Sequence, residues 1–249
     1  MLREERLNFI LEKLKINQKV TSTELMAEFQ VSEGTIRRDL NELEEKGLLQ
    51  KVHGGAMLKP AAPRFFDGRM EYASETKTAL AQKALPLIKE GQLIMIDGGT
   101  SNWHLAKLLP LELKATIFTN SIPIVNTLLN HPNIQLHFMG GTVFKESQVT
   151  IGMEVIRTIN DLRADICFVG VRGVHPEFGI TTLEKNEAEV KKTMTQRSSK
   201  VVVMATKDKL NVVDHYKICD FADIDLLITE EGIQPELIKA FEVLGVEVV

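Results

Sequence analysis

Between residue 77 and the C-terminus, short apolar runs alternate with segments of helical periodicity, and this alternation restricts the fold more than any other feature. The apolar runs predict strands at residues 93–96, 116–119, 134–139, 166–171, 201–205, 226–228 and 246–249. The other segments predict helices at residues 77–85, 102–109, 123–130, 154–161, 187–197 and 235–244, with Pro86 ending or kinking the first. Strands that alternate with helices form mainly parallel sheets covered on both faces. This part of the chain is therefore predicted to be an α/β domain.

The chain has 249 residues, which is more than one hydrophobic core usually organises. Its one cluster of proline and alanine, Pro60-Ala61-Ala62-Pro63, favours an extended spacer. We therefore predict a small N-terminal domain at residues 1–58, a linker at 59–72 and the α/β domain at 73–249.

The composition excludes several classes of protein. No apolar run approaches the roughly 20 residues that a membrane span needs, and the N-terminus lacks the pattern of a signal peptide, so we expect a soluble cytoplasmic protein. Cys167 and Cys219 have no CxxC partner and are expected to be reduced core residues. The six histidines are scattered, so we expect no metal ion and no cofactor. The net charge of −4 leaves any nucleic-acid contact to local charge.

The first 60 residues predict a helix-turn-helix. A first helix has an apolar stripe at Leu7, Ile10, Leu11 and Leu14. A capping box formed by Thr21 and Glu24 begins a short second helix. Ser32 then caps a third helix, whose apolar residues are Ile36, Leu40 and Leu43 and which is expected to stop at Gly47. Two helices joined by so short a turn are typical of helix-turn-helix DNA-binding domains.

The third helix would present small and cationic residues to DNA. At about 100° per residue, Gly34, Arg38 and Asn41 face away from the apolar stripe, with Arg37 on the flank and Thr35 near the N-terminal end. The N-terminal part of a recognition helix enters the major groove, where cationic side chains are favoured.

A β-wing is expected after the third helix. Residues 48–52 alternate like a strand, and His53-Gly54-Gly55-Ala56 reverses the chain. Lys51 and His53 beside glycine N–H groups suit a phosphate or minor-groove contact. The alternative is that both glycines merely form a hairpin turn.

The segment Val31 to Ala56, VSEGTIRRDLNELEEKGLLQKVHGGA, closely resembles the DNA-binding signature of the DeoR/GlpR family of transcriptional repressors. The matching residues include the run from Thr35 to Leu40 and the His53-Gly54-Gly55-Ala56 turn. The predicted contacts to double-stranded operator DNA are accordingly Ser32, Thr35, Arg37, Arg38, Asn41, Lys51, His53, Gly54 and Gly55.

Polar residues and glycines follow three predicted strands of the α/β domain. Asp97-Gly98-Gly99-Thr100-Ser101 comes between a strand and a helix, so backbone N–H groups and hydroxyls meet a helix N-terminus and form an anion cradle. Asn120-Ser121 and Gly140-Gly141-Thr142 follow the next two strands. Ligands of open parallel sheets bind at such strand ends. The alternative is that each glycine only satisfies the backbone geometry of its turn.

This domain also resembles the sensor domain of the DeoR family, which is related to ribose-5-phosphate isomerase and CoA transferases. The resemblance implies a phosphorylated sugar or similar metabolite as effector. The effector-binding residues are expected to be Asp97, Gly98, Gly99, Thr100, Ser101, Thr119, Asn120, Gly140, Gly141, Gly170, Glu187, Lys191 and Lys209. Where the family usually has Asp-His-Ser-Lys, this chain has Thr206-Lys207-Asp208-Lys209, a departure that bears on which effector it binds. For Glu187 and Lys191, the alternative is a surface ion pair.

Together these features predict a repressor of sugar or carbohydrate-metabolism genes, released from its operator by a phosphorylated metabolite and without catalytic activity. Because one such module reads a short site, we expect a symmetric homo-oligomer on repeated half-sites. One alternative is a sugar-phosphate isomerase with a DNA-binding appendage, for which Asp97, Glu187 and Lys209 would be the catalytic groups. Another is an activator or architectural protein without a ligand. The sequence leaves the effector, the operator and the regulated genes open.

Overall fold

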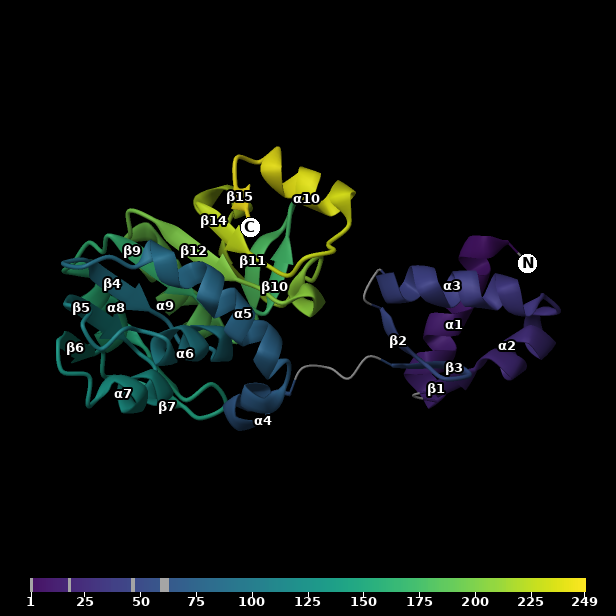
Figure 1. Cartoon of the computed structure of the whole chain (residues 1–249), viewed down its shortest axis with the longest axis horizontal. Coiled ribbons are helices and arrows are strands. Elements are labelled where there is room, and N and C mark those ends of the chain that lie inside the picture. The colour runs from purple at the N-terminus through teal and green to yellow at the C-terminus, as the bar shows by residue number, and fades with distance from the viewer. Residues whose placement is uncertain (1, 18, 46–47, 59–62) are drawn as a thin grey trace. The chain divides into compact units, whose positions relative to one another are not determined.

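A computed structural model of the chain describes residues 2–17, 19–45, 48–58 and 63–249 (Figure 1). The chain divides into two compact units, residues 1–62 and 63–249. The expected helix stop at Gly47 and the Pro60-Ala61-Ala62 part of the expected spacer lie outside the described residues. Within the described ranges, no helix is long and apolar enough to cross a membrane.

The first unit is a winged helix-turn-helix. Its elements are α1 (Arg3–Asn17), β1 (Lys19–Thr21), α2 (Ser22–Phe29), α3 (Glu33–Glu45), β2 (Leu49–Val52) and β3 (Gly55–Leu58). The strands form an antiparallel sheet in the order β1-β3-β2. Thr21 and Glu24 form the predicted capping box of α2. The predicted apolar stripes meet in one core that includes Leu7, Ile10, Leu14, Ile36, Leu40 and Leu43.

The second unit is built on a seven-stranded sheet. In the order β15-β14-β12-β9-β4-β5-β6, the strands are Glu247–Val248, Leu226–Ile228, Val201–Met204, Ile166–Val169, Leu93–Ile96, Ala115–Thr119 and Ile134–Phe138. Every neighbouring pair is parallel. The chain runs outward from β4 through β5 to β6, and from β9 through β12 and β14 to β15. The direction of winding therefore reverses between β4 and β9, the place where open parallel sheets bind ligands.

Helices cover both faces of this sheet (Figure 1). One face carries α5 (Ser74–Ala84), α6 (Thr100–Lys107) and α7 (Ile122–Leu128), which share a core with β4 and β5. The other carries α8 (Met153–Asn160), α9 (Lys185–Gln196) and α10 (Pro235–Glu242), which pack on β9, β12 and β14. As predicted from Pro86, α5 ends at Ala84, and a 3₁₀ turn, η1 (Leu85–Leu87), follows. The α/β prediction is confirmed.

Several elements are additional to the prediction. They are a hairpin of β7 (Thr142–Phe144) and β8 (Val149–Ile151), a small antiparallel sheet of β10 (Gly173–His175), β11 (Gly179–Thr182) and β13 (Tyr216–Cys219), and two 3₁₀ turns, η2 (Lys207–Lys209) and η3 (Phe221–Asp223). These strands have too few residues for a periodicity to stand out in the sequence.

The structure differs from the expected linker at residues 59–72. Phe66–Glu71 form the helix α4, and the second unit begins at Pro63. The Phe66 side chain is buried, and its N–H donates to the carbonyl of Glu146 at 2.8 Å. The ammonium group of Lys77 in α5 donates to the carbonyls of Arg69 and Tyr72 at the end of α4. These contacts fix α4 on the α/β unit.

Candidate functional site

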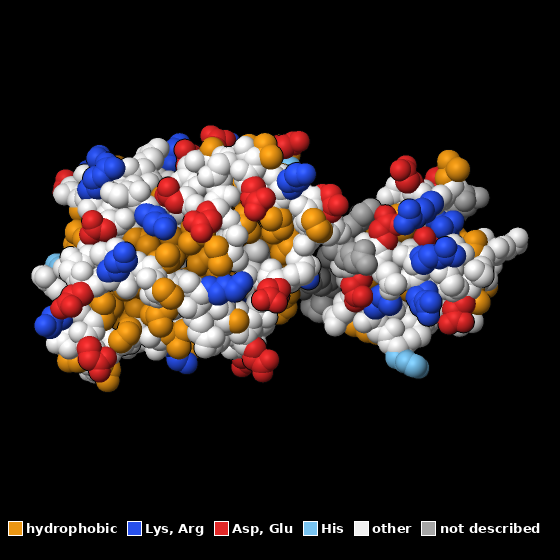
Figure 2. Space-filling model, turned by 45° about the horizontal axis from the view of Figure 1, so that its top comes forward, with side chains coloured by type: hydrophobic (Ala, Val, Ile, Leu, Met, Phe, Trp, Pro, Cys, Tyr) orange, Lys and Arg blue, Asp and Glu red, His pale blue; other side chains and the backbone are white. Residues whose placement is uncertain are grey.

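The exposed face of α3 carries the predicted DNA-contacting residues. Ile36, Leu40 and Leu43 are buried, whereas Arg37 and Arg38 are exposed. Arg38 Nε donates to the carbonyl of Gly34 at 3.0 Å, which leaves its terminal nitrogens for other partners. Figure 2 shows that Lys and Arg side chains gather on the visible face of the first unit, with acidic side chains among them.

The N-terminus of α3 is built by a local hydroxyl pair. Ser32 Oγ accepts from the N–H of Thr35 at 3.3 Å and lies 3.0 Å from Thr35 Oγ1. These two side chains therefore cap the recognition helix, and any contact that they make to a phosphate comes in addition to this role.

The wing is fastened to the recognition helix. The Lys51 ammonium group donates to Asn41 Oδ1, and the Lys51 N–H donates to Glu44 Oε1 at 2.8 Å. Asn41 and Lys51, both expected to contact DNA, are thus engaged with each other here.

The two wing glycines have backbone roles. Gly54 has φ +81° at the tip of the hairpin, and its carbonyl accepts from Ser22 N–H at 2.8 Å. A Cβ at Gly55 would lie 2.1 Å from the carbonyl oxygen of Val20, so only glycine fits where β3 pairs with β1. This supports the structural alternative for both glycines, while the exposed His53 side chain remains free to approach DNA.

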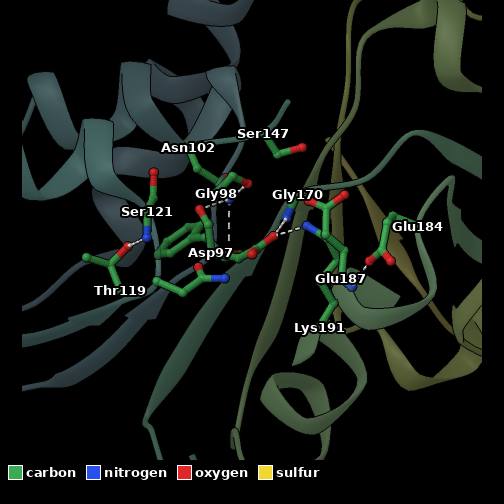
Figure 3. Close-up of polar contacts among 12 residues, drawn as sticks. Asp97, Gly98, Asn102, Thr119, Ser121, Ser147, Gly170, Glu184, Glu187 and Lys191 are labelled. Atoms are coloured by element: carbon green, nitrogen blue, oxygen red, sulfur yellow. Dashed lines mark hydrogen bonds and ion pairs between the residues drawn. The ribbon is translucent and has the colours of Figure 1, made fainter. Parts of the chain in front are cut away.

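In the second unit, a buried carboxylate at the end of β4 contacts both α9 and the end of β9. The Asp97 carboxylate accepts from the Lys191 ammonium group of α9 and from the N–H of Gly170 at 2.9 Å (Figure 3). Asp97 is 1% exposed and Lys191 4%. The alternative of a surface pair between Glu187 and Lys191 does not describe this contact, because the partner of Lys191 is Asp97.

The strand ends at the switch point approach too closely for side chains. A Cβ at Gly170 would lie 2.2 Å from the carbonyl oxygen of Gly98, and a Cβ at Gly98 would lie 2.2 Å from Val149 Cγ1. Asn102 Nδ2 bridges the same strands by donating to the carbonyls of Asp97 at 2.9 Å and Phe168 at 3.0 Å.

The turn that follows β4 opens onto the N-terminus of α6. Gly99 is the N-cap, with φ +123° and no side chain to cap the helix. The first turn of a helix leaves backbone N–H groups without helical partners, which favours an anion there. Ser101 Oγ is buried and has no hydrogen-bond partner in the part of the chain that the structure describes. The predicted anion cradle therefore has free donors.

The residues after β5 contribute differently. Thr119 Oγ1 accepts from Ser121 N–H at 3.1 Å, so Thr119 shapes the strand end itself. Asn120 Nδ2 donates to the carbonyl of Thr150 at 3.1 Å. Asn120 Oδ1 and Ser121 Oγ are buried without a partner among the described residues, which suits them to bind ligand hydroxyls.

The two glycines after β6 have different surroundings. Gly140 is exposed with open space around it. A Cβ at Gly141 would lie 2.7 Å from the carbonyl oxygen of Ile151, which indicates a close backbone approach between β7 and β8.

Cationic side chains gather beside the switch point, and most of them were not in the predicted site. Burial lowers the pKa of Lys209 to about 7 and that of Lys77 to about 8. Arg69 and Arg172 lower the pKa of Lys209 further, so the four positive charges act on one region. Neither Arg69 nor Lys209 forms an ion pair with any described carboxylate. The charge of Asp208 opposes part of this effect on Lys209, and the charges of Glu187 and Asp97 act in the same way on Arg69.

A cavity of about 290 Å³ adjoins this cluster. Its lining includes Arg69, Arg172, Ser147, Glu184 and Glu187. Burial raises the pKa of Glu187, and Glu184 Oε2 caps α9 by accepting from Glu187 N–H at 2.7 Å. Ser147 lies between β7 and β8, in the hairpin whose Val149 approaches Gly98 at the switch point. Arg69 lay in the expected linker and Arg172 directly after the strand predicted at residues 166–171, and neither was among the expected effector-binding residues.

The fold and these sites define a class of protein: a DNA-binding winged helix-turn-helix joined to an α/β unit whose strand ends carry glycines and unpartnered polar groups. Two family models match the chain, the DeoR-like helix-turn-helix domain over residues 6–60 and the DeoR C-terminal sensor domain over residues 72–231. The chain belongs to the DeoR family of helix-turn-helix transcriptional regulators, as the resemblance predicted.

Two curated relatives match along nearly their whole length. The HTH-type transcriptional regulator GolR of Listeria innocua is 35% identical over 98% of this chain and 97% of its own. The HTH-type transcriptional repressor GlcR of Bacillus subtilis is 33% identical over 92% of this chain and 89% of its own. Among solved structures, ribose 5-phosphate isomerase A of Methanocaldococcus jannaschii is 17% identical, with a TM-score of 0.42 over 55% of each chain.

Proposed function

We propose that this regulator represses genes of sugar or carbohydrate metabolism and leaves its operator when a phosphorylated sugar binds at the β4–β9 strand ends. The observation that carries the proposal is that the Gly98–Ser101 turn lies at a helix N-terminus, in a unit where Lys209 forms no ion pair with a described carboxylate. Backbone N–H groups with a lysine or arginine are the usual partners of a phosphate.

The unpartnered hydroxyl and amide oxygens support a sugar as the rest of the effector. Besides Ser101 Oγ in the phosphate turn, Asn120 Oδ1 and Ser121 Oγ are buried without partners among the described residues. Buried polar groups are normally hydrogen-bonded, so a polyhydroxylated ligand would complete them.

The same geometry supports a sensor without catalytic activity. An isomerase needs a general base within reach of its substrate. The Asp97 carboxylate is 1% exposed and already accepts from Lys191 and Gly170, so it is engaged in holding the strands together. Failure of the purified chain to interconvert common pentose and hexose phosphates is the expected result, and measurable turnover would favour the isomerase.

The test is an operator titration with and without ligand. The full chain would first select its site from random duplex DNA. The affinity for that site would then be measured by fluorescence anisotropy in the presence of a panel of sugar phosphates. At least one phosphate should weaken operator binding, while the matching unphosphorylated sugar should not.

Ser101→Ala should raise the concentration of phosphate ligand needed for release by about 10- to 100-fold, because a hydrogen bond to a charged group is lost. Operator affinity without ligand should stay unchanged. Ser199→Ala is the matched control, since Ser199 is exposed and contacts Arg163 at the opposite ends of the strands. An unaltered response of the Ser101 variant would place the phosphate elsewhere.

A further inference from the structure

Two arginines that line the cavity beside the switch point each have a buried Nε without a hydrogen bond among the described residues. Arg69 Nε and Arg172 Nε are both inaccessible and have no hydrogen-bond partner within the described residues. Leaving a charged donor buried and unsatisfied is costly, so such groups usually meet a ligand or water. Both arginines line the same cavity of about 290 Å³.

None of the described acids around this cavity forms an ion pair with Arg69. Glu146 pairs with the exposed Arg64 at 3.4 Å, and Glu184 caps α9. Arg172 Nε lies 3.5 Å from Asp214 Oδ2, an ion-pair distance without hydrogen-bond geometry. Among the described residues, the Arg69 guanidinium forms one long hydrogen bond, in which Nη2 donates to Ser147 Oγ at 3.4 Å.

Glu187 contributes less negative charge than a fully ionised carboxylate would. Burial raises the pKa of this carboxyl group, which favours its neutral form. A neutral carboxyl can donate a hydrogen bond to an anion. This shift moves the charge balance of the cavity towards positive.

The arginine pair is separate from the phosphate cradle but adjoins it. Burial lowers the pKa of Arg69, and the charges of Glu187, Arg172 and Asp97 also act on it. Asp97 directly precedes the Gly98–Ser101 turn, and the β7–β8 hairpin contributes Ser147 to the cavity lining and approaches Gly98 with Val149. The cavity volume is near the lower end for small-molecule sites, about 300 Å³.

We propose that the effector carries a second anionic group, a carboxylate or a second phosphate, which binds between Arg69 and Arg172 while its first phosphate occupies the Gly98–Ser101 turn. This inference rests on the proposed function and narrows it from sugar phosphates in general to doubly anionic ones. Two planar guanidinium groups at one site suit an oxyanion with several acceptor oxygens.

The experiment uses probes that do not depend on sugar stereochemistry. Calorimetry on the full chain would compare α,ω-alkanediol bisphosphates of graded chain length with the matching monophosphates. Phosphorylated ω-hydroxy carboxylic acids form a third series, which distinguishes a carboxylate from a second phosphate. Fructose 6-phosphate and fructose 1,6-bisphosphate add one sugar pair.

At the best chain length, a doubly anionic probe should bind about 10- to 100-fold more tightly than its monophosphate. Arg172→Met should remove most of this advantage and leave monophosphate affinity within about twofold, whereas Arg172→Lys should keep part of it. Arg163→Met, at an exposed arginine on the opposite ends of the strands, is the control and should change neither affinity. Arg69→Met serves as the second variant if Arg172→Met does not fold.

The outcomes separate the two proposals. If monophosphates bind and a second anion adds nothing, or if Arg172→Met weakens both probes equally, the second subsite is overturned and the proposed function stands. If neither these probes nor any sugar phosphate binds, both proposals fail.

Discussion

At the scale of single residues, two acids that belong to sequence motifs prove to be buried partners of one cation each. Asp39, inside the helix-turn-helix signature, is 2% exposed and accepts from Arg6 of α1 at 2.5 and 3.1 Å. Asp97, at the strand end, is held by Lys191. In both places the carboxylate joins two elements, so its presence in a motif reflects folding as well as function.

The Arg6–Asp39 pair should stabilise the first unit measurably. Arg6→Met keeps most of the volume but leaves the Asp39 carboxylate buried without its partner, which should cost about 1–3 kcal/mol. Hydrogen exchange of α1 and α3 in the full chain would report it as lost protection. Arg3→Met is the matched control, because the Arg3–Glu42 pair is largely exposed on the arginine side and such pairs contribute about 0–1 kcal/mol. Equal effects of the two variants would contradict this assignment.

Lys209 should take up a proton when a phosphate binds. Burial lowers its pKa to about 7, so at pH 8 the free protein carries mostly the neutral amine. A neighbouring phosphate dianion favours the ammonium form, so binding at pH 8 should take up about one proton more in the wild type than in Lys209→Met. At pH 6 the amine is already charged and this difference should nearly vanish. Calorimetry at saturating ligand in HEPES and Tris measures the uptake, and equal values at pH 8 would exclude Lys209 from the phosphate site.

At the scale of elements, the strands of the large sheet were predictable because each is a continuous apolar run with helices before and after it. The hairpin of β7 and β8 was not, because strands as short as Thr142–Phe144 show no period. The helix α4 was not predicted, because the neighbouring prolines indicated an extended spacer. It is held by the hydrogen bond of Phe66 with Glu146, about 80 residues away in the chain.

The candidate site was also predictable only in part. The Gly98–Ser101 turn follows from local sequence, since a strand, two glycines and a helix start stand in line. Arg69 and Arg172 do not, because their convergence depends on how α4 and the loop after β9 pack around the cavity. The Asp97–Lys191 pair likewise joins residues 94 positions apart.

The recognition helix yields a prediction for DNA binding. Arg38 is exposed, and the bond from its Nε to Gly34 orients its terminal nitrogens away from the core. Arg38→Ala should cost about 1–3 kcal/mol of operator affinity and relax specificity at one base pair, as expected for a bidentate guanine contact. Anisotropy titrations on the selected operator and its single-base variants measure both effects. Unchanged affinity in a folded variant would remove Arg38 from the interface.

At the scale of the whole molecule, regulation requires that effector binding to the second unit changes the free energy with which the first unit binds DNA. An effector can release DNA only if it binds the DNA-free arrangement more tightly than the DNA-bound one, since equal affinity shifts nothing. Symmetric pairing of chains on repeated half-sites would place two recognition helices about one helical turn, roughly 34–36 Å, apart. The proposed repressor therefore needs both an oligomer and a coupling energy.

That coupling energy must be the same when measured from either side. If the effector weakens operator binding by a factor of about 5–150, corresponding to about 1–3 kcal/mol, then saturating operator DNA must weaken effector binding by the same factor. The first factor comes from anisotropy titrations with and without effector, and the second from calorimetry of the effector with free protein and with the protein–operator complex. Both need one buffer and salt concentration, because DNA affinity depends strongly on salt.

A scrambled duplex that binds only nonspecifically controls for bulk charge. If operator DNA excludes the effector altogether, the two ligands compete directly for the protein, and if the loss of DNA affinity depends on protein concentration, the effector acts by dissociating the oligomer. Light scattering during the titration separates these two, and either result would replace the model of two coupled sites.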